Sequence, residues 1–348
     1  MEQFSLRPRV YFGPEPLAAL AELGDAGVFV VTDRFLADSG LLDRVKVHLK
    51  GTVTVFDQVK PDPSLELVAQ GVLAFQASGA GAILAFGGGS PMDCAKAIRH
   101  FSGRTLPLWC VPTTAGTGSE VTSFAILTDT AKGAKHALVD DALLPDAALL
   151  SAEFLAGVPA GVTADTGMDV LTHAAEAYVA RGANGFTDAL AESAFVTAFR
   201  LLPAAHRGDM EAKAAMLEAS CMAGMAFNAA GLGVCHSLAH ALGGAYHLPH
   251  GKINSILLPH VITWHAEGVP RTAQKYGRLA KRCGLAPNAR ALAAGLRRLA
   301  RSLGEPERFP EEIDVPRIAA QAMTDRCTPS DPAAVTVADL GRLLEGIR

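Results

Sequence analysis

The sequence predicts two domains: an N-terminal α/β domain with a parallel, Rossmann-like sheet and a C-terminal domain made only of helices. The chain has 348 residues, which is enough for about two domains. In its first half, β-branched runs alternate with helical patterns, as is typical of βαβ units. Near residue 155 the strand signals stop and Ala-rich segments with helical spacing begin. We therefore expect the domains to cover residues 1–157 and 158–348.

Short apolar runs predict the strands of the first domain, at residues 28–33, 52–57, 82–90 and 106–114. The segment after the third run, PMDCAKAIRHF, has helical spacing. In the second domain, Ala-rich segments such as FTDALAESAFVTAFRLL and VCHSLAHALGGAY predict helices, and so do residues 270–283, 288–303 and 333–347. Ligands of parallel α/β sheets bind at the carboxyl ends of the strands, so the loops there are candidate binding sites.

The composition excludes several classes of protein. The formal net charge is −4 and no Lys/Arg run stands out, so we expect no nucleic-acid partner. No apolar run of about 18 residues is free of breaks, so we expect no membrane span. The six cysteines are scattered without a CxxC pair, which indicates buried thiols in a reducing compartment. These features predict a globular cytoplasmic protein.

The loop FGGGSPMD (86–93) closes one predicted strand and opens a helix. Ser90 is a plausible N-cap, with Pro91 in the first turn and Asp93 completing a capping box. Three glycines let a phosphate approach the backbone, and the N–H groups at a helix start attract anions. A glycine turn without a ligand is the alternative. GAGA (79–82) precedes its strand and therefore does not match the common dinucleotide fingerprint.

Two further features could bind a dinucleotide. Asp33 ends the run 28–33, where a carboxylate can bind a ribose 2′-hydroxyl and favour NAD over NADP, although a turn or capping aspartate is the alternative. The loop PTTAGTGSE (112–120) follows the next strand and is rich in hydroxyl and glycine positions. It could line a pyrophosphate or a nicotinamide, or be an ordinary loop.

A cluster of histidines predicts a metal site. The apolar segment 231–254 contains four of the eleven histidines in the chain, and two of them, His236 and His240, share a helix face. Upstream, Asp169 and His173 are also four residues apart. Buried carboxylates and imidazoles are costly unless they are paired or ligated. We therefore predict that one cation is bound by Asp169, His173, His236 and His250.

Different interpretations of this cluster stay open. Any single histidine could be a satisfied core residue. Nitrogen and oxygen ligands without a thiolate suit Fe(II) or Zn(II), and intrinsic affinity alone would favour Zn(II). Cys235 adjoins His236, and we expect its thiol to pack away from the ligand face.

The motifs GGGSPMDCAK, PTTAGTGSEVT, GMDVLTHAAEAY, FTDALA, AGMAFNAAGLGVCHSLAHALGG and PHG together resemble the iron-dependent (group III) alcohol dehydrogenases. The resemblance runs from about residue 5 to beyond residue 285. Within this family, FSLRPRVYFG, MDVLTHA and GGAYHLPHG are similar to the 1-propanol dehydrogenases of microcompartment pathways.

The resemblance implies the dehydroquinate synthase-like fold and places functions on individual residues. The family's metal ligands fall on the four predicted ligands, Asp169, His173, His236 and His250. His240 falls on a further active-site histidine, and Asp33 falls on the acid that favours NAD. The cofactor loops fall on Gly88, Gly89, Ser90, Asp93, Thr113, Thr114 and Ser119. Phe227 falls on a wall of the substrate pocket. From their apolar character we add Leu232 and Phe124 to that pocket.

The implied activity is the interconversion of short-chain primary alcohols and aldehydes, such as propanol and propanal, with NAD(H). The implied metal is Fe(II), with Zn(II) as a possible substitute, and it would lower the pKa of the alcohol hydroxyl. His240 is the candidate proton relay. The family also implies a homodimer that pairs through its N-terminal strands. The protein could be enclosed in a bacterial microcompartment, with the shell or aldehyde-producing enzymes as partners.

The sequence departs from the family pattern at Ser151, at WHAE (264–267) and at Lys252. None of these positions is a predicted ligand. A rival function is an NAD-dependent metal lyase of the dehydroquinate synthase type. Its acidic substrate would need basic residues, yet residues 208–270 contain only Lys213 and Lys252. A zinc polyol dehydrogenase of the glycerol type and a non-catalytic scaffold are two further candidate functions.

Overall fold

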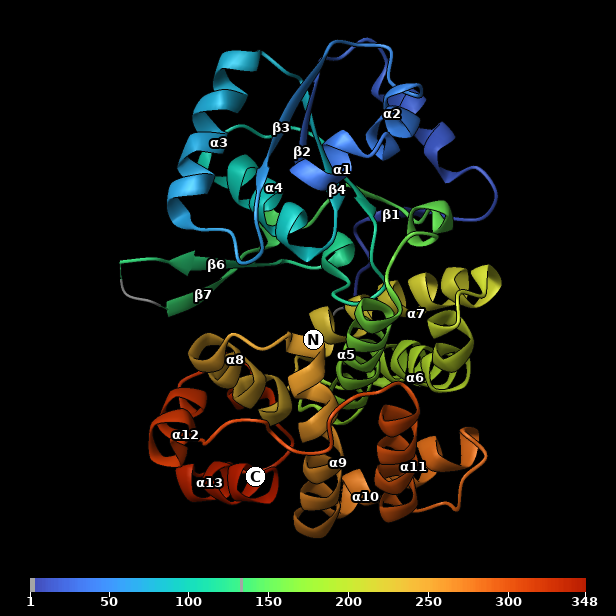
Figure 1. Ribbon diagram of the computed structural model, residues 1–348, viewed down its shortest axis with the longest axis vertical. Coiled ribbons are helices and arrows are strands. Elements are labelled where there is room, and N and C mark those ends of the chain that lie inside the picture. The colour runs from blue at the N-terminus through green and yellow to red at the C-terminus, as the bar shows by residue number, and fades with distance from the viewer. Residues whose placement is uncertain (1–3, 132–133) are drawn as a thin grey trace. The chain divides into compact units, whose positions relative to one another are not determined.

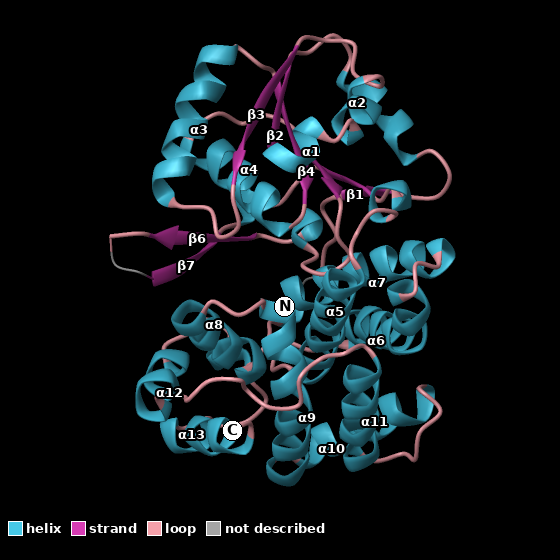
Figure 2. Cartoon of the chain, in the orientation of Figure 1, coloured by secondary structure: helices cyan, strands magenta, loops and turns pink. Residues whose placement is uncertain are grey.

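The computed structural model describes residues 4–131 and 134–348 and divides into two compact units. The first unit ends at Gly157 and the second begins at Val158. Figure 1 labels the helices and strands, and Figure 2 shows that the strands all lie in the first unit and that the second consists of helices and loops. The α/β class of the first unit and the helical class of the second are as the sequence predicts.

Within the described residues, the first unit holds a six-stranded parallel sheet with the order β1-β8-β5-β4-β2-β3. The strands are β1 (Arg9–Tyr11), β2 (Val28–Asp33), β3 (Val53–Val59), β4 (Ala82–Gly87), β5 (Leu108–Pro112) and β8 (Ala147–Leu149). β4 and β5 lie in the interior of the sheet and are buried along their whole length, which agrees with their uninterrupted apolar sequences.

Helices cover both faces of this sheet (Figure 1). On one face, α3 (Leu65–Ser78) and α4 (Gly89–Phe101) pack on a core that includes Phe29 and Phe75. On the other face, the 3₁₀ helix Pro16–Leu23, α1 (Arg34–Asp38) and α2 (Leu41–Lys46) pack on a core that includes Val30 and Trp109. Alternate residues of β2 enter the two cores because successive side chains of a strand point to opposite faces.

The sequence misses two short strands and a hairpin of the first unit. β1 and β8 have only three residues each, too few to show a periodic pattern. The antiparallel hairpin of β6 (Phe124–Asp129) and β7 (Ala134–Val139) lies outside the parallel sheet. Short 3₁₀ turns follow at Asp141–Leu143 and Ala152–Leu155.

The predicted capping of α4 is wrong. The N-cap is Gly88 rather than Ser90, and no side chain caps the helix. The helix therefore begins at Gly89, inside the glycine run, and Ser90 and Pro91 belong to its first turn. Glycine is favoured at this helix start because a Cβ would be crowded by the side chains of Thr114 and Thr117. The free N–H groups of the first turn thus come from the glycine loop itself.

The second unit contains nine α-helices, all within described residues. They are α5 (Ala160–Val179), α6 (Gly185–His206), α7 (Met210–Ala230), α8 (Val234–Tyr246), α9 (His250–Gly268), α10 (Pro270–Arg282), α11 (Ala289–Ser302), α12 (Val315–Met323) and α13 (Val337–Gly346). Segments 270–283 and 288–303 agree with α10 and α11 to within a residue, whereas the helix expected over 333–347 begins later, at Val337, where Thr336 caps it.

Among the described residues, no helix taken singly has the length and apolar character needed to cross a membrane. Within the same described residues, the pair α7 and α8 taken together meets those criteria, and the chain bends by 105° between them.

Candidate metal centre

Three helices of the second unit present the predicted metal ligands. α5 carries Asp169 and His173, α8 carries His236, and His250 is the first residue of α9. Asp169 and His173 lie one turn apart and therefore share a face of α5. The side chains of Asp169, His173 and His236 are at most 7 % exposed, although each carries polar atoms.

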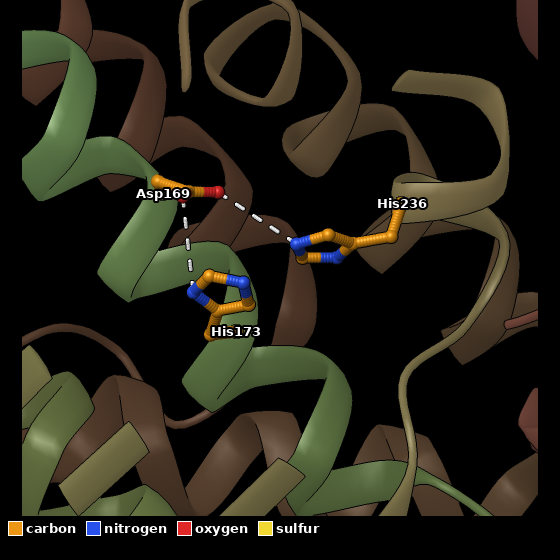
Figure 3. A group of neighbouring side chains, drawn as sticks. All are labelled: Asp169, His173 and His236. Atoms are coloured by element: carbon orange, nitrogen blue, oxygen red, sulfur yellow. Dashed lines mark ion pairs between the residues drawn. The ribbon is translucent and has the colours of Figure 1, made fainter. Parts of the chain in front are cut away.

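The four side chains converge around the Asp169 carboxylate. Figure 3 shows that Asp169 and His173 project from α5 toward His236. The Asp169 oxygens lie 3.9 Å from His173 Nδ1, 3.7 Å from His236 Nε2 and 3.6 Å from His250 Nε2. The rings of His173 and His236 are stacked, with 4.5 Å between their centroids. The structure thus brings together one carboxylate and three imidazoles from helices far apart in sequence.

Glu176 fixes the orientation of His236. Its Oε2 lies 2.5 Å from His236 Nδ1, and both side chains are 1 % exposed. Because a carboxylate only accepts hydrogen bonds, Nδ1 carries a proton, which leaves Nε2 as the ring nitrogen that can give its lone pair to a metal ion. Nε2 is buried and has no hydrogen-bond partner among the residues that the structure describes. A carboxylate behind a ligating histidine is the usual arrangement around protein-bound metals.

Asn254, one turn further along α9, lies beside His250 and Asp169. Asn254 Nδ2 lies 3.1 Å from His250 Nε2 and donates a hydrogen bond of 2.8 Å to Asp169 Oδ1. Asn254 is buried and also contacts the Cys235 thiol. The Cys235 thiol thus contacts the Asn254 side chain, and burial raises the pKa of this thiol well above the usual value.

The charges of the cluster favour a cation. Burial raises the pKa of the Asp169 carboxyl, but the surrounding imidazoles outweigh burial and hold this pKa well below its usual range. For His236, burial lowers the pKa, whereas the carboxylates of Asp169 and Glu176 raise it to about 9. Burial also holds the pKa of His250 well below its usual value. Next to Asp169, positive charge is therefore stabilised on His236 but not on His250.

These residues fit a divalent metal ion. Metal bonds of about 2.1 Å at tetrahedral angles separate two ligand atoms by about 3.4 Å. The spacings of 3.6–3.9 Å around Asp169 are close to that value, and the buried Nε2 of His236 faces the carboxylate. The candidate ligand atoms of Asp169, His173 and His236 all lie within 4.8 Å of one another. Because the donors are nitrogen and oxygen atoms, they suit iron or zinc.

His240 lies at the rim of the cluster. Its ring stacks on that of His250, with 5.2 Å between the centroids, and its side chain is 28 % exposed. Asp325 Oδ2 accepts a hydrogen bond from His240 Nδ1 over 3.0 Å. His240 Nε2 can therefore accept a proton, as a general base requires.

The apolar residues predicted for the substrate pocket belong to different elements of the two units. The ring of Phe227, on α7, stacks on His173 with 4.5 Å between the centroids. Leu232 is buried in the turn between α7 and α8. Phe124 belongs to β6 of the first unit, where its carbonyl accepts a hydrogen bond from Lys96. Phe227 thus contacts a predicted ligand directly.

The two predicted cofactor loops contact each other at the ends of β4 and β5. Thr113 N donates to the carbonyl of Gly87, and a Cβ on Gly88 would lie 3.2 Å from Thr114 Oγ1. A Cβ on Gly89 would lie 2.9 Å from the methyl of Thr117. Glycine is therefore required for the two loops to lie this close together, and the free N–H groups at the start of α4 lie beside the Thr-rich loop.

Asp93 and Ser119 join the loops instead of facing outward. The Ser119 hydroxyl donates to Asp93 Oδ1, and Asp93 Oδ2 accepts from the backbone of Ile126. Lys96, which is fully buried, donates to Ser119 and Thr122. Burial raises the pKa of Asp93, and the nearby Lys96 partly offsets this effect. Both predicted cofactor residues thus have internal partners.

Asp33 caps a helix. Its Oδ1 accepts a hydrogen bond of 2.9 Å from Leu36 N at the start of α1. This is the capping role that the sequence left open. The neighbouring Arg34 pairs with Asp57 over 2.6 Å.

Three supporting residues escaped prediction from the sequence. Glu176 follows His173 by three residues, and Asn254 follows His250 by four, so helical spacing could have identified both. Asp325 lies in the loop after α12, and no sequence pattern links it to His240.

Known proteins match the chain along almost its whole length. Residues 8–152 match the family model described as iron-containing alcohol dehydrogenase, and residues 163–347 match the C-terminal model of the same family. The 1-propanol dehydrogenase PduQ of Salmonella typhimurium is 47 % identical over 295 residues, covering 82 % of this chain and 80 % of that protein.

Solved structures agree with this assignment. A 1,3-propanediol oxidoreductase superposes with a TM-score of 0.94 at 32 % identity, and both chains are fully covered. A sulfoacetaldehyde reductase from Bifidobacterium kashiwanohense, solved with NAD⁺, has a TM-score of 0.90 at 26 % identity and covers 100 % of this chain and 98 % of its own. The family and fold predicted from the motifs are therefore confirmed, and the chain belongs to the iron-containing alcohol dehydrogenase family.

Proposed function

We propose that the chain interconverts short primary alcohols and aldehydes with NAD(H) and a divalent metal ion, Fe(II) in the cell, bound by Asp169, His173, His236 and His250. One observation carries the proposal: a buried carboxylate faces three imidazole nitrogens at 3.6–3.9 Å. In this proposal residues 158–348 form the metal-binding catalytic domain and residues 1–157 the NAD-binding domain.

The chain's own residues position the reactants and move the proton. A divalent ion at this site supplies Lewis acidity, which lowers the pKa of an alcohol hydroxyl and polarises an aldehyde carbonyl. Glu176 orients the His236 ring, and Asn254 donates a hydrogen bond to Asp169. His240, oriented by Asp325, takes up the proton of the alcohol and passes it to solvent.

The surroundings of the metal site favour a small, uncharged substrate. Phe227 covers one side of His173 with an aromatic ring. The only lysine or arginine side chains of residues 208–270, Lys213 and Lys252, both have partners. Lys213 donates to the carbonyl of Val158, and Lys252 pairs with Asp165 and Glu305. An acidic substrate of the lyase type would lack a free cation in this stretch of the chain.

We propose that NAD(H) binds to the first unit at the ends of β2, β4 and β5. The start of α4 at Gly89 offers backbone N–H groups to the pyrophosphate, together with Ser90, Thr113 and Thr114. Asp33 Oδ2, which is not needed for the helix cap, is the proposed acceptor for the ribose 2′-hydroxyl. Asp93 and Ser119 support these loops from within.

Turnover by metal-depleted protein tests the function. The full-length chain, purified without oxygen and treated with a chelator, is assayed for NADH formation with ethanol, 1-propanol and glycerol, before and after addition of Fe(II) or Zn(II). We expect activity only after metal is added, and faster activity with 1-propanol than with glycerol. Full activity without metal, or none with either metal on any alcohol or aldehyde, would contradict the proposal.

Two histidine variants show whether the proposed ligands are responsible for metal binding and activity. His250→Gln removes a proposed ligand, and we expect loss of bound metal and of activity. His247→Asn is the matched control, because His247 is exposed and has a positive φ of 56°, which asparagine tolerates. Equal effects of both variants would show that loss of activity reflects damage to this segment rather than loss of a ligand.

We further propose a homodimer that pairs along β1. This strand is an edge of the sheet, and the exposed Leu6 and Phe12 flank it. An uncovered edge with apolar neighbours is a ready template for pairing. Analytical ultracentrifugation of the wild type and of Phe12→Asp tests this, with a shift toward monomer expected for the variant. The resemblance to propanol dehydrogenases of microcompartment pathways supports enclosure in a shell, which co-purification with shell particles would test.

A further inference from the structure

The segment that follows α12, residues 325–331, runs along α8 in the opposite direction and contacts it at every third residue. Asp325 hydrogen-bonds His240, the Thr328 hydroxyl lies 2.8 Å from that of Ser237, and Asp331 Oδ2 accepts from Val234 N over 2.9 Å. Residues 234, 237 and 240 lie on one face of a helix because they are three residues apart. The 325–331 segment therefore packs along the face of α8 that carries His240.

The start of α8 lacks a cap of its own. Its N-cap is Gly233, which has no side chain, so the first free N–H groups must find partners elsewhere. Asp331 accepts from Val234 N, and Glu176 accepts from the N–H groups of Cys235 and His236. A Cβ on Gly233 would lie 2.7 Å from Asp331 Oδ2 and 2.9 Å from Glu176 Oε1. Two buried carboxylates from distant parts of the chain therefore replace a local cap.

Asp331 is itself held by a buried network. Its carboxylate lies 3.0 Å from His265 Nε2, and both side chains are 0 % exposed. His265 Nδ1 lies 3.0 Å from the hydroxyl of Tyr276, which is also fully buried. Burial raises the pKa of Tyr276 well above its usual value, so the phenol keeps its proton and remains a hydrogen-bond donor. Arg181 adds hydrogen bonds to the carbonyls of Asp331 and Ala333.

Burying an aspartate–histidine pair costs free energy, because both groups lose their contact with water. Removing either partner would leave a charge or a donor unpaired in the core, whereas two apolar residues of the same volume would avoid the cost. In the structure, this pair places one carboxylate oxygen of Asp331 where it accepts a hydrogen bond from Val234 N. Val234 lies two residues before the proposed ligand His236 on the same helix, so a shift of the helix start would move His236.

We propose that Asp331, held by His265, is a positioning residue for the metal ligand on α8. It touches neither substrate nor metal, and it acts by fixing the first turn of the helix that carries His236 and His240. The proposal rests on the metal centre proposed above. It assigns a role to the His265 of WHAE (264–267), where the sequence departs from the family pattern.

Zn(II) binding to the metal-free, full-length chain tests this without recourse to activity. The dissociation constant is measured by competition with a chromogenic chelator. We expect Asp331→Asn and His265→Leu to weaken Zn(II) binding about tenfold, the lower end of the range for residues that support metal ligands. His265→Gln retains an N–H donor near the position of Nε2, so it should stay within about threefold of wild type, a rescue that mere packing does not explain.

Asp188→Asn is the matched control. Asp188 pairs with the buried Lys275 over 2.7 Å, and this pair lies on α6 and α10 rather than on α8. The substitution should lower the thermal midpoint and leave Zn(II) affinity unchanged. If Asp331→Asn and His265→Leu behave in the same way, the pair is only structural and the proposal is wrong.

Three more outcomes are also decisive. If His265→Leu does not fold, Asp331→Asn is compared with His265→Gln instead. Equal Zn(II) affinities of these two variants and the wild type would overturn the proposal. If the wild-type chain binds no Zn(II), the metal centre fails and this proposal fails with it. If the wild type binds and the variants bind equally well, the metal centre stands and only the role of Asp331 fails.

Discussion

At the scale of single residues, hydrogen bonds decide what each histidine of the cluster can do. His236 and His240 lie one turn apart on α8, but carboxylates from different elements hold their Nδ1 atoms. Glu176 leaves a buried His236 Nε2 facing Asp169, whereas Asp325 holds a His240 ring that is partly open to solvent. The first environment suits a metal ligand and the second suits a proton relay.

His240→Ala should keep the metal and lose turnover. We expect unchanged metal content, because His240 is not among the proposed ligands, and a fall in kcat of about 10²-fold, typical of a lost general base. Metal analysis and steady-state kinetics on the same preparation check this. Asp325→Asn should give a smaller fall, since the ring remains but its orienting carboxylate is gone. Loss of metal from His240→Ala would show that His240 is a ligand.

Asp33→Ser should relax the preference for NAD over NADP. Serine retains a hydroxyl that can cap α1 but removes the charge that repels a 2′-phosphate. We expect kcat/KM for NADP⁺ to rise at least tenfold with little change in stability. Asp33→Ala should show the same change in preference and also lose about 1 kcal/mol of stability from the missing cap. Unchanged selectivity in both variants would exclude Asp33 from the cofactor site.

At the scale of elements, the loop after β5 has a buried acid at its centre. Glu120 lies in the 3₁₀ turn Ser119–Val121, is 1 % exposed, and has an Oε1 without a hydrogen-bond partner among the described residues. Burial raises its pKa to about 7, although its backbone hydrogen bond and Lys96 oppose this. The folded protein therefore holds a proton on Glu120 that the unfolded chain releases near its ordinary pKa.

The stability of the wild type should therefore fall between about pH 4.5 and pH 7. A raised acid pKa stabilises the folded state below the unfolded pKa, and this contribution is lost as pH rises through the folded value. A shift from 4.5 to about 7 corresponds to about 3 kcal/mol. Denaturant unfolding at several pH values checks this. Glu120→Gln should remove that part of the slope, whereas Glu15→Gln, at an exposed position of the same unit, should not.

Helix α8 shows how an element can depend on distant parts of the chain. Its start is capped by Glu176 from α5 and Asp331 from the loop before α13, not by a residue of its own. Some other helices of the second unit are capped by a residue of their own, as Asn184 caps α6 and Thr336 caps α13, whereas α5, α9 and α10 have no side-chain cap. The start of the helix that carries two histidines of the cluster thus depends on tertiary contacts.

At the scale of the whole molecule, the two units carry different kinds of sites. The first unit holds glycine and threonine loops at the ends of parallel strands, and the second holds the histidine cluster between helices. Metal removal should therefore act mainly on the second unit. We expect Fe(II)-loaded enzyme to lose activity in air and to regain it with Fe(II) and a reductant, because Fe(II) is readily oxidised.

Activity, metal content and NADH binding, measured before and after exposure to air, check this prediction. NADH binding should change little, because the proposed cofactor loops belong to the first unit. Activity that is stable in air and survives a chelator would contradict the assignment of iron.

The sequence by itself determined the α/β class of the first part of the chain, the helical class of the rest, the parallel character of the sheet and the family. It also singled out Asp169, His173, His236 and His250, because helical spacing and apolar surroundings are local properties. Prediction from local sequence patterns failed at the N-cap of α4 and at the three-residue strands β1 and β8. There, contacts with distant parts of the chain outweigh the local preference.

Only the tertiary structure decided which atoms meet. Residues 325–331 lie about ninety positions from α8 in sequence, yet they contact His240, Ser237 and Val234. The His265–Asp331 pair joins residues 66 positions apart. No periodic pattern encodes such contacts, because they depend on how helices pack and not on the spacing within any one helix. The candidate ligands could be read from the sequence, whereas the residues that hold them in place could be identified only from the folded chain.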